Sequence, residues 1–362
     1  MVMKYNICDS PNWYFEAAAC ISEYYTNIED KVIKNHKNFG MTIEEMEDFF
    51  SKFKSYKKAV IGEILPIYNR YPSLEWLFKP VKYNVNMDEC MGVSLISYLI
   101  GYSTEYMNDD LIDKVTLEFV FDVLSDIFGT EDAENLKIEG ISDLVNVLEN
   151  NNINDDIFKM HLIRLYHARY KTIRDLWEML NLCVPILKKH YDMIEDHVQM
   201  ALQALPSGEG LERILKVSAG LYIRSNLDCT LYPTIYFFNR IKYELNPISR
   251  QAYVGIYVLQ LINLKEKNEY MEDELVKDLK ALGDPTRFKI IRILLEREMY
   301  LKELAEEINL TSATVSHHID ILQKSNLISV TIGDDDGRKV LFDVNREKLK
   351  SIGDSINRLS YI

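Results

Sequence analysis

The sequence lacks the features of membrane and secreted proteins. Its longest apolar candidate, Met91–Tyr102, is far shorter than the ~20 residues that a membrane-spanning helix needs, and a buried core helix is the better interpretation. At the amino end, Asp9 and Pro11 stand where the apolar core of a signal peptide would run. We therefore expect a cytoplasmic protein that does not contact a membrane.

Paired cysteines and an excess of positive charge are also lacking. The five cysteines lie far apart without a CxxC pair, which fits reduced thiols in a cytoplasm better than a disulfide framework. The chain has 42 Lys and Arg against 56 Asp and Glu, a formal net charge of -14. The segment Leu275–Ile362 is neutral, with 14 residues of each sign. Because phosphate contacts need a positive surface, net charge opposes nucleic-acid binding everywhere except in this segment.

Motifs for catalysis, cofactors and metals are missing as well. The glycine cluster Ser207–Gly210 matches neither the GxxxxGK[ST] nor the GxGxxG spacing, and a loop between helices explains it. His190 and His197 can share a helix face and His161 and His167 align less well, but an HExxH zinc motif is absent. We interpret these histidines as solvated or packed side chains. The sequence therefore predicts no enzymatic activity, no cofactor and no metal site.

Length and composition predict two domains. At about 150 residues per domain, 362 residues suffice for two or three. The charged stretch Asn263–Glu274 follows the apolar run Ala252–Ile262, as a linker or a solvated helix does. We place the boundary near residue 270, which divides the chain into residues 1–270 and 271–362.

The first domain is predicted to be mainly helical. Thr42 and Glu45 match a capping box at the start of a helix. Helical spacing also extends over residues 155–181, and a further helix with Pro185 near its start reaches Leu205.

A small β element is predicted near residues 220–260, where β-branched and aromatic residues are frequent, and a short strand over residues 2–8 can join it. The aromatic side chains here either line an effector pocket or form ordinary sheet core or inter-domain packing, and we favour the second interpretation. They include Tyr232, Tyr236, Phe237, Phe238, Tyr243 and Tyr253. The predicted fold is thus mainly α with small β elements.

The second domain opens with three helices in close succession. An amphipathic helix over Leu275–Gly283 is followed by Asp284 at an N-cap and Pro285 at the first helical position. Two more helices, over residues 285–298 and 301–308, carry apolar residues at helical spacing.

The next helix is predicted over residues 312–325, with Thr311 as its N-cap. Val315, Ile319 and Leu322 fall at i, i+4 and i+7 and should pack inward. The outward positions are small or hydrogen-bonding, and they are Ser312, Ala313, Thr314, Ser316 and His317.

Two alternating segments joined by Asp334–Gly337 predict a β-hairpin, and a last helix follows over residues 345–358. The last three of these four helices, followed by a hairpin and a closing helix, describe a winged helix-turn-helix. In such a unit the second helix of the turn reads base edges in the major groove, while the hairpin lies against the backbone or the minor groove. Ser, Thr and His can hydrogen-bond bases, so we expect double-stranded DNA as the partner. A small α/β domain with polar surface helices is the alternative interpretation.

Residues 281–295, 301–310 and 311–328 closely resemble the arsenical-repressor (ArsR) family of bacterial winged-helix regulators, through the combination of DPTR with TVSHHIDIL. The resemblance covers about 85 of the 362 residues. It implies a homodimer whose interface is formed by Leu275–Gly283 and Asn345–Arg358. It also implies DNA contacts, which are assigned by position to Thr311, Ser312, Ala313, Thr314, Ser316, His317 and, in the wing, to Arg338 and Lys339.

The sequence departs from the metal-sensing members of that family. The stretch Met299–Leu304 has no cysteine and the last helix has no histidine, so metal sensing at either family site is not expected. The acidic tip Asp334–Asp336 repels phosphate, which leaves the arms of the hairpin to contact DNA. Ser312 stands where the family often has Gln, which leaves the base preference open.

Our hypothesis is therefore a DNA-binding transcriptional regulator of the ArsR type, a repressor by family precedent, that binds an operator as a homodimer. Residues 1–270 would sense an unknown small-molecule effector or dimerise. The alternative is a protein-interaction module whose acidic helical part binds a partner and whose winged helix mediates protein contacts.

Overall fold

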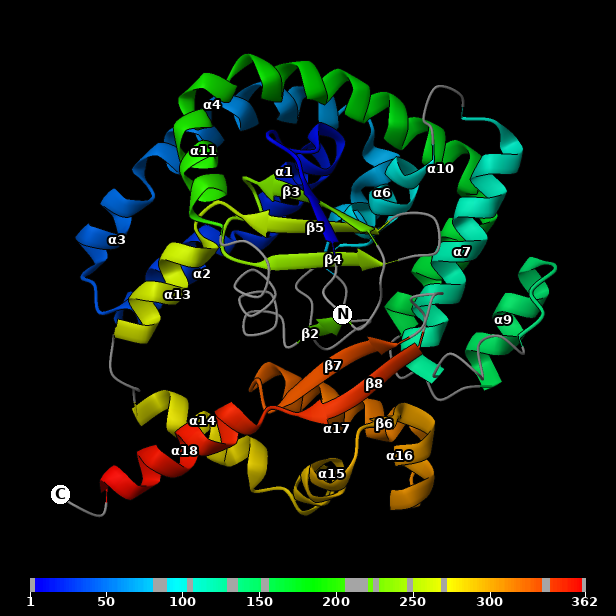
Figure 1. The fold of residues 1–362 in the computed structure, drawn as a ribbon. Coiled ribbons are helices and arrows are strands. Elements are labelled where there is room, and N and C mark those ends of the chain that lie inside the picture. The colour runs from blue at the N-terminus through cyan, green and yellow to red at the C-terminus, as the bar shows by residue number, and fades with distance from the viewer. Residues whose placement is uncertain are drawn as a thin grey trace.

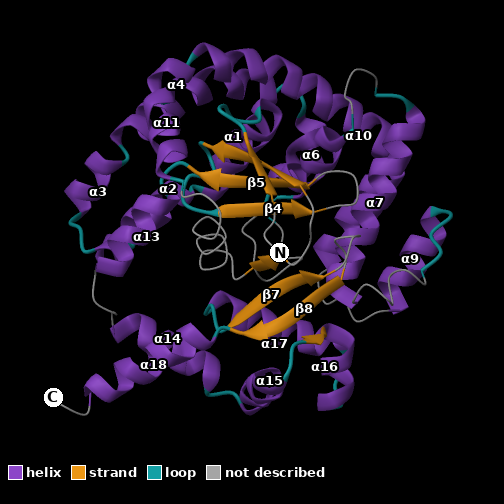
Figure 2. Ribbon diagram, viewed as in Figure 1, coloured by secondary structure: helices purple, strands orange, loops and turns teal. Residues whose placement is uncertain are grey.

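The computed structural model describes residues 4–80, 90–102, 107–128, 136–150, 156–205, 221–223, 228–245, 250–267, 272–333 and 339–359. Helices predominate, and the described strands form two four-stranded sheets (Figures 1 and 2). The predicted fold, mainly α with small β elements, is therefore confirmed. None of the described helices is long and apolar enough to cross a membrane.

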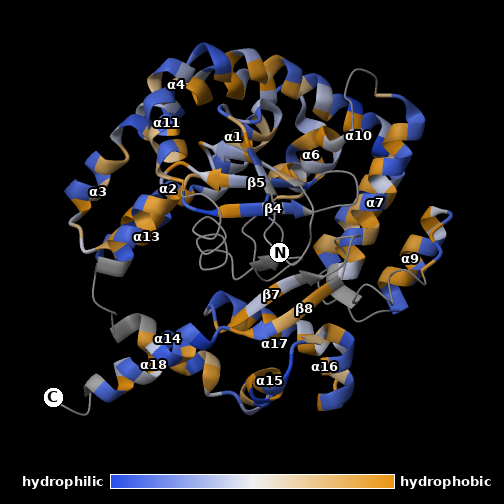
Figure 3. Cartoon of the chain, viewed as in Figure 1, coloured by the Kyte–Doolittle hydropathy of each residue, from blue (hydrophilic) through white to orange (hydrophobic). Residues whose placement is uncertain are grey.

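Helices surround the first sheet in the N-terminal part of the chain, which we define as the described residues up to 267. Hydrophobic and hydrophilic stripes alternate around them, as expected for amphipathic helices (Figure 3). These helices are α1 (Trp13–Thr26), α2 (Ile28–Lys34), α3 (Ile43–Phe49), α4 (Ser51–Tyr68), α5 (Glu75–Phe78), α6 (Met91–Gly101), α7 (Asp109–Phe128), α9 (Ile141–Asn150), α10 (Asp156–Lys189), α11 (Glu195–Ala204) and α13 (Val258–Lys267), with short 3-10 turns at His36–Phe39, Pro72–Leu74 and Tyr191–Met193.

The predicted helix end near residue 181 is wrong, because α10 continues through Pro185 to its last residue, Lys189. Pro185 lacks the N–H that would bond the carbonyl one turn earlier, and this loss alone favours a break. Cys183 and Leu187, on either side of it, are fully buried, so packing against the core keeps the helix continuous. The departure from helical geometry lies instead at Ala168, where φ is -103° and ψ is 17°.

The first sheet has the order β1 (Lys4–Ile7), β3 (Asp228–Thr234), β5 (Arg250–Gly255) and β4 (Ile241–Leu245). The first three strands are parallel, and β4 is antiparallel to β5. The predicted strands near residues 2–8 and 220–260 are confirmed. A Cβ atom at Gly255 would lie 2.3 Å from the carbonyl oxygen of Phe237, so only glycine fits where β5 passes the turn after β3.

Aromatic side chains join this sheet to the helices. Tyr236, Phe237, Phe238 and Tyr253 are at most 3% exposed, which confirms their interpretation as core. The ring of Phe15 in α1 stacks on that of Tyr253, with 3.6 Å between the centroids. Two further members of the predicted aromatic set, Tyr232 and Tyr243, are partly buried.

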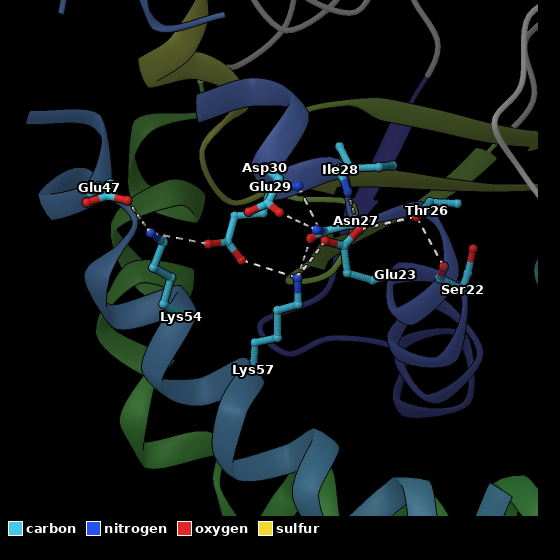
Figure 4. A network of polar contacts seen from close by, with 10 residues as sticks. All are labelled: Ser22, Glu23, Thr26, Asn27, Ile28, Glu29, Asp30, Glu47, Lys54 and Lys57. Atoms are coloured by element: carbon cyan, nitrogen blue, oxygen red, sulfur yellow. Dashed lines mark hydrogen bonds and ion pairs between the residues drawn. The ribbon is translucent and has the colours of Figure 1, made fainter. Parts of the chain in front are cut away.

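A group of buried charges fixes α1, α2 and α4 against one another (Figure 4). Lys57 Nζ in α4 lies 2.9 Å from Glu23 Oε1 in α1 and 3.3 Å from Glu29 Oε2 in α2, and both carboxylates are buried. Glu23 also accepts a hydrogen bond from the backbone N–H of Ile28, at 3.0 Å. Buried charges are tolerated only when they are paired, so these contacts specify how the three helices pack.

The C-terminal part contains the predicted order of helices and hairpin. It comprises α14 (Glu272–Leu282), α15 (Pro285–Glu296), β6 (Met299–Tyr300), α16 (Leu301–Ile308), α17 (Ser312–Lys324), β7 (Ile328–Gly333), β8 (Lys339–Val344) and α18 (Arg346–Leu359). We call these residues, 272–359, the winged helix, and the hairpin β7–β8 the wing. The predicted domain boundary near residue 270 lies outside the described residues, as does the cluster Ser207–Gly210.

The winged helix has its own hydrophobic core, built mainly from α15, α16, α17 and the wing. Two features of its sheet were not predicted. Met299 and Tyr300 form the short strand β6, which pairs with β8, because backbone pairing extends the sheet there before α16 begins. On the other side, β2 (Leu221–Ile223) from the N-terminal part pairs with β7 in parallel, so the order is β2-β7-β8-β6.

Candidate nucleic-acid interface

The turn before α17 is set by Asn309 and Thr311. Asn309 ends α16 with a left-handed φ of 64°, a conformation that asparagine tolerates better than most residues. Thr311 Oγ1 accepts a hydrogen bond from the backbone N–H of Thr314 at 3.2 Å, which confirms the predicted N-cap. The two hydroxyl groups lie 2.8 Å apart. Cap and turn together fix the direction in which α17 leaves its partner helix.

The inner face of α17 is the one that the sequence predicts. Val315, Ile319 and Leu322 are at most 2% exposed and pack into the core of the winged helix. Of the candidate DNA-contacting residues on this segment, Thr311, Thr314 and His317 are exposed, and Ser312, Ala313 and Ser316 are partly exposed. Their backbone positions form the first turns of α17 and the cap before it.

Of the two candidate DNA-contacting residues in the wing, the structure describes only Lys339. Arg338 lies outside the described residues, together with the acidic tip of the wing. Lys339 is the first residue of β8, where its backbone pairs with that of Gly333 across the hairpin.

The motif Asp284–Arg287 holds the helices of the domain together. Asp284 caps α15 by accepting hydrogen bonds from the backbone N–H groups of Thr286 and Arg287, at 3.0 and 2.9 Å. The Arg287 guanidinium reaches back and donates to the carbonyl oxygens of Ala281, at 2.5 Å, and of Lys280, at 2.9 Å. It therefore joins the end of α14 to the start of α15. Sequence reasoning identified the cap but not this second role of the arginine.

His318 in α17, the helix that we call the recognition helix, lies near the motif Asp284–Arg287. Its Nδ1 atom lies 3.8 Å from Asp284 Oδ1, and the side chain is largely covered. Burial lowers the pKa of His318, although the Asp284 carboxylate opposes that effect. The backbone N–H of Arg287 is the main cause that lowers the pKa of Asp284. His318 thus lies between α17 and the Asp284 cap, whereas its neighbour His317 is exposed.

The first and last helices of the winged helix are joined by a buried ion pair. Lys348 Nζ in α18 lies 2.8 Å from Asp278 Oδ2 in α14, and the aspartate is only 2% exposed. Apolar side chains on the same two helices, Val276, Leu279 and Ile356, are 40–48% exposed. Sequence reasoning selected these helices through a family resemblance but missed the ion pair that holds them together.

Within the described residues, no group of three or more His, Cys, Asp or Glu side chains is placed to hold a metal ion.

Comparison with known proteins matches this region to one family. Residues 284–330 match the model described as "Bacterial regulatory protein, arsR family". The transcriptional repressor SdpR of Bacillus subtilis is 36% identical over 78 residues, which is 22% of this chain and 80% of SdpR. The regulator CmtR of Mycobacterium tuberculosis is 35% identical over 74 residues, 20% of this chain and 60% of CmtR. An uncharacterized regulator of Methanocaldococcus jannaschii, MJ1325, is 38% identical over 50 residues, 14% of this chain and 56% of that protein.

No solved structure matches the chain. The similarity to the curated relatives covers at most about a fifth of it, and the matched family model ends at residue 330. The matched residues, 284–330, include the helices α15, α16 and α17. The chain therefore belongs to the ArsR family of bacterial regulatory proteins, as a DNA-binding transcriptional regulator.

Proposed function

We propose that this protein regulates transcription by binding operator DNA as a homodimer, and that residues 1–270 form a domain that responds to a small-molecule effector. The observation that carries the proposal is the first half of α17. There the helix is capped, its inner face is fully packed, and hydrogen-bonding side chains lie on the outside.

The chemistry of this segment suits DNA. The hydroxyl of Ser316 and the ring of His317 can donate to or accept from base edges in the major groove. The start of α17 offers backbone N–H groups and a positive dipole end to a phosphate. Because α17 is seated on a rigid core, these groups would enter the groove in a fixed register.

Dimerisation through α14 and α18 is supported by their surface. Val276 and Leu279 on α14 and Ile356 on α18 are exposed apolar residues, and Phe288, near the start of α15, is 54% exposed. Burial of such side chains against a second copy would stabilise a dimer by about 25 cal/mol per Å² of apolar surface. A two-fold dimer would place two recognition helices on successive major grooves, which matches a palindromic operator.

The test is fluorescence anisotropy of the full chain on its own upstream DNA and on scrambled DNA, across a series of salt concentrations. A regulator should prefer the upstream fragment, and its affinity should fall steeply with salt because bound counterions are released from DNA. Equal affinity for both fragments at every salt concentration would contradict operator recognition and favour the protein-interaction alternative.

Two variants test the proposed readout. Ser316→Ala and His317→Ala should each weaken operator binding by about 1–3 kcal/mol if these side chains contact bases. His167→Ala, at an exposed histidine on α10, is the matched control and should bind as the wild type does. Unchanged affinity of both α17 variants would contradict the assignment of the recognition face.

A further inference from the structure

Strand β7 of the wing is buried on both faces. Successive side chains of a strand point to opposite sides, so one face of a hairpin normally packs on its helices and the other meets solvent. In β7, Ile328 and Val330 are 1% and 8% exposed, as expected for the face on the core. Ser329 and Thr331, on the opposite face, are both 2% exposed. The outer face of β7 is therefore covered as well.

The outer edge of the wing is also occupied. β2 pairs with β7 in parallel, with Leu221 beside Val330, Tyr222 beside Thr331 and Ile223 beside Ile332. This strand comes from the N-terminal part, more than 100 residues earlier in the chain. Figure 1 shows the wing lying between the helices of its own domain and the N-terminal part.

The recognition helix is approached by a helix from outside its domain. Besides its neighbours in the winged helix, α17 packs near α7, with Cα atoms within 8 Å. Asp320 follows Ser316 by one turn and Ala313 by two, so it continues the outward stripe that the candidate DNA contacts begin. It is nevertheless only 9% exposed. Part of the outward surface of α17 is thus covered in this structure.

DNA needs the space that these contacts occupy. A recognition helix fits into a major groove about 12 Å wide, whose two walls are the sugar-phosphate backbones. The backbone of α7 lies within 8 Å of that of α17, so α7 and a groove wall cannot flank the same side of α17. The formal net charge of -14, all of it before Leu275, adds repulsion between phosphate and the part of the chain docked there.

We infer that this structure is a closed state in which the N-terminal part and operator DNA compete for the wing and the recognition helix. The inference rests on the proposed function. In this state β2 holds the edge of the wing and α7 flanks α17, and the winged helix must separate from both before α17 can enter a groove. A ligand that binds the separated state more tightly than the closed one would raise DNA affinity, and a ligand with the opposite preference would lower it.

A disulfide that locks β2 onto β7 tests the inference. The double variant Tyr222→Cys/Thr331→Cys places cysteines at paired positions of the two strands. The oxidised protein should lose operator binding, and a reductant should restore the affinity of the wild type. The matched control, Asn6→Cys/Thr230→Cys, crosslinks paired positions of the parallel strands β1 and β3 in the first sheet and should bind DNA in both redox states. Wild type, treated identically, controls for its five native cysteines.

The outcomes separate the two proposals. If the oxidised β2–β7 variant binds the operator as well as the reduced one, the closed state does not compete with DNA, although the proposed function stands. Failure of the crosslink to form would show that β2 does not dock on β7, and would also overturn the inference. If wild type and both reduced variants bind no operator, the proposed function itself fails. A release variant, Tyr222→Pro, removes a backbone N–H from β2 and should strengthen operator binding.

Discussion

At the residue scale, Glu16 is a carboxyl group with no exposure to solvent. It lies in the first turn of α1 and is fully buried, and its Oε2 atom accepts hydrogen bonds from the backbone N–H groups of Ile235 and Tyr236, both at 3.1 Å. Burial raises the pKa of Glu16 to about 7, although these hydrogen bonds oppose the rise. The carboxyl group thus ties α1 to the turn after β3.

This environment predicts a pH-dependent stability. Because the pKa of Glu16 is higher in the folded chain than the ordinary 4.5, the folded state holds the proton more tightly between those values. The free energy of unfolding should therefore fall as pH rises from 5 to 8, with a contribution from Glu16 on the order of 2 kcal/mol. Urea unfolding at several pH values measures it. The variant Glu16→Gln should have a shallower slope, and an identical slope in both proteins would contradict the prediction.

The buried charges around Lys57 make a second prediction at this scale. Lys57→Met removes the cation that lies between Glu23 and Glu29, so buried Glu23 would lose its ion pair and buried Glu29 its closer one. The loss of stability should be about 3 kcal/mol.

Lys54→Met is the matched control on the same helix. Lys54 also lies near Glu29, at 3.7 Å, and near Glu47, at 3.5 Å, but its side chain is 36% exposed. Its loss should cost less than about 1 kcal/mol. Thermal unfolding of both variants measures the difference. Equal losses of stability would argue that Lys57 does not neutralise the buried carboxylates of Glu23 and Glu29.

Helix caps were predictable from sequence, because a capping residue bonds to backbone groups only two or three residues further along the chain. Thr42, Asp284 and Thr311 all cap helices where the sequence places them. The partners of Glu16 and Lys57 were not predictable, since the hydrogen bonds of these side chains reach from 28 to 220 residues along the chain. No local pattern distinguishes such a carboxylate from a solvated one.

At the element scale, the start of the recognition helix makes the next prediction. Thr311→Ala removes the oxygen that accepts the N–H of Thr314, which should destabilise the winged helix by about 1 kcal/mol. Because the first turn of α17 carries the proposed readout, DNA affinity should fall as well. Thr311→Ser keeps the hydroxyl and should restore both properties. Denaturant unfolding and anisotropy measure them, and equal behaviour of the two variants would contradict a capping role.

Periodicity predicted helices better than it predicted strands and helix ends. The apolar face of α17 was predicted correctly because Val315, Ile319 and Leu322 recur at helical spacing. The spacing within α15 was less informative, since Phe288 shares the helical spacing of Ile291 and Leu294 but is 54% exposed. The strand β6 depends on pairing with β8, some 40 residues later, and no spacing rule detects a strand of two residues.

At the scale of the whole molecule, the exposed apolar residues of α14 and α18 predict the state of assembly. Leu279→Glu should convert the proposed dimer to a monomer without unfolding it, because Leu279 is 40% exposed in the single chain. Operator affinity should fall with it, since one chain offers only one recognition helix.

Sedimentation velocity measures the assembly state, and circular dichroism monitors the fold. Met160→Glu, at a residue that is 60% exposed on α10, is the control and should leave the dimer intact. A wild-type protein that sediments as a monomer at every concentration would contradict dimerisation.

The sequence predicted the winged helix as a unit, but it did not predict the contacts between the winged helix and the N-terminal part. The order of its elements follows from local patterns and from residues that match the ArsR family. The pairing of β2 with β7 joins segments with no shared local signal. Long-range contacts of this kind depend on the complete fold, which local periodicity does not encode.

The side chains at the outer face of β7 have a consequence for the separated state of the molecule. Ser329 and Thr331 carry hydroxyl groups, which water can solvate as readily as a packed neighbour can cover them. If the winged helix separates from the N-terminal part, the side chains that β7 exposes would be polar and would not add to an apolar patch. Separation of the two parts would therefore expose hydroxyl groups of β7 that can hydrogen-bond water.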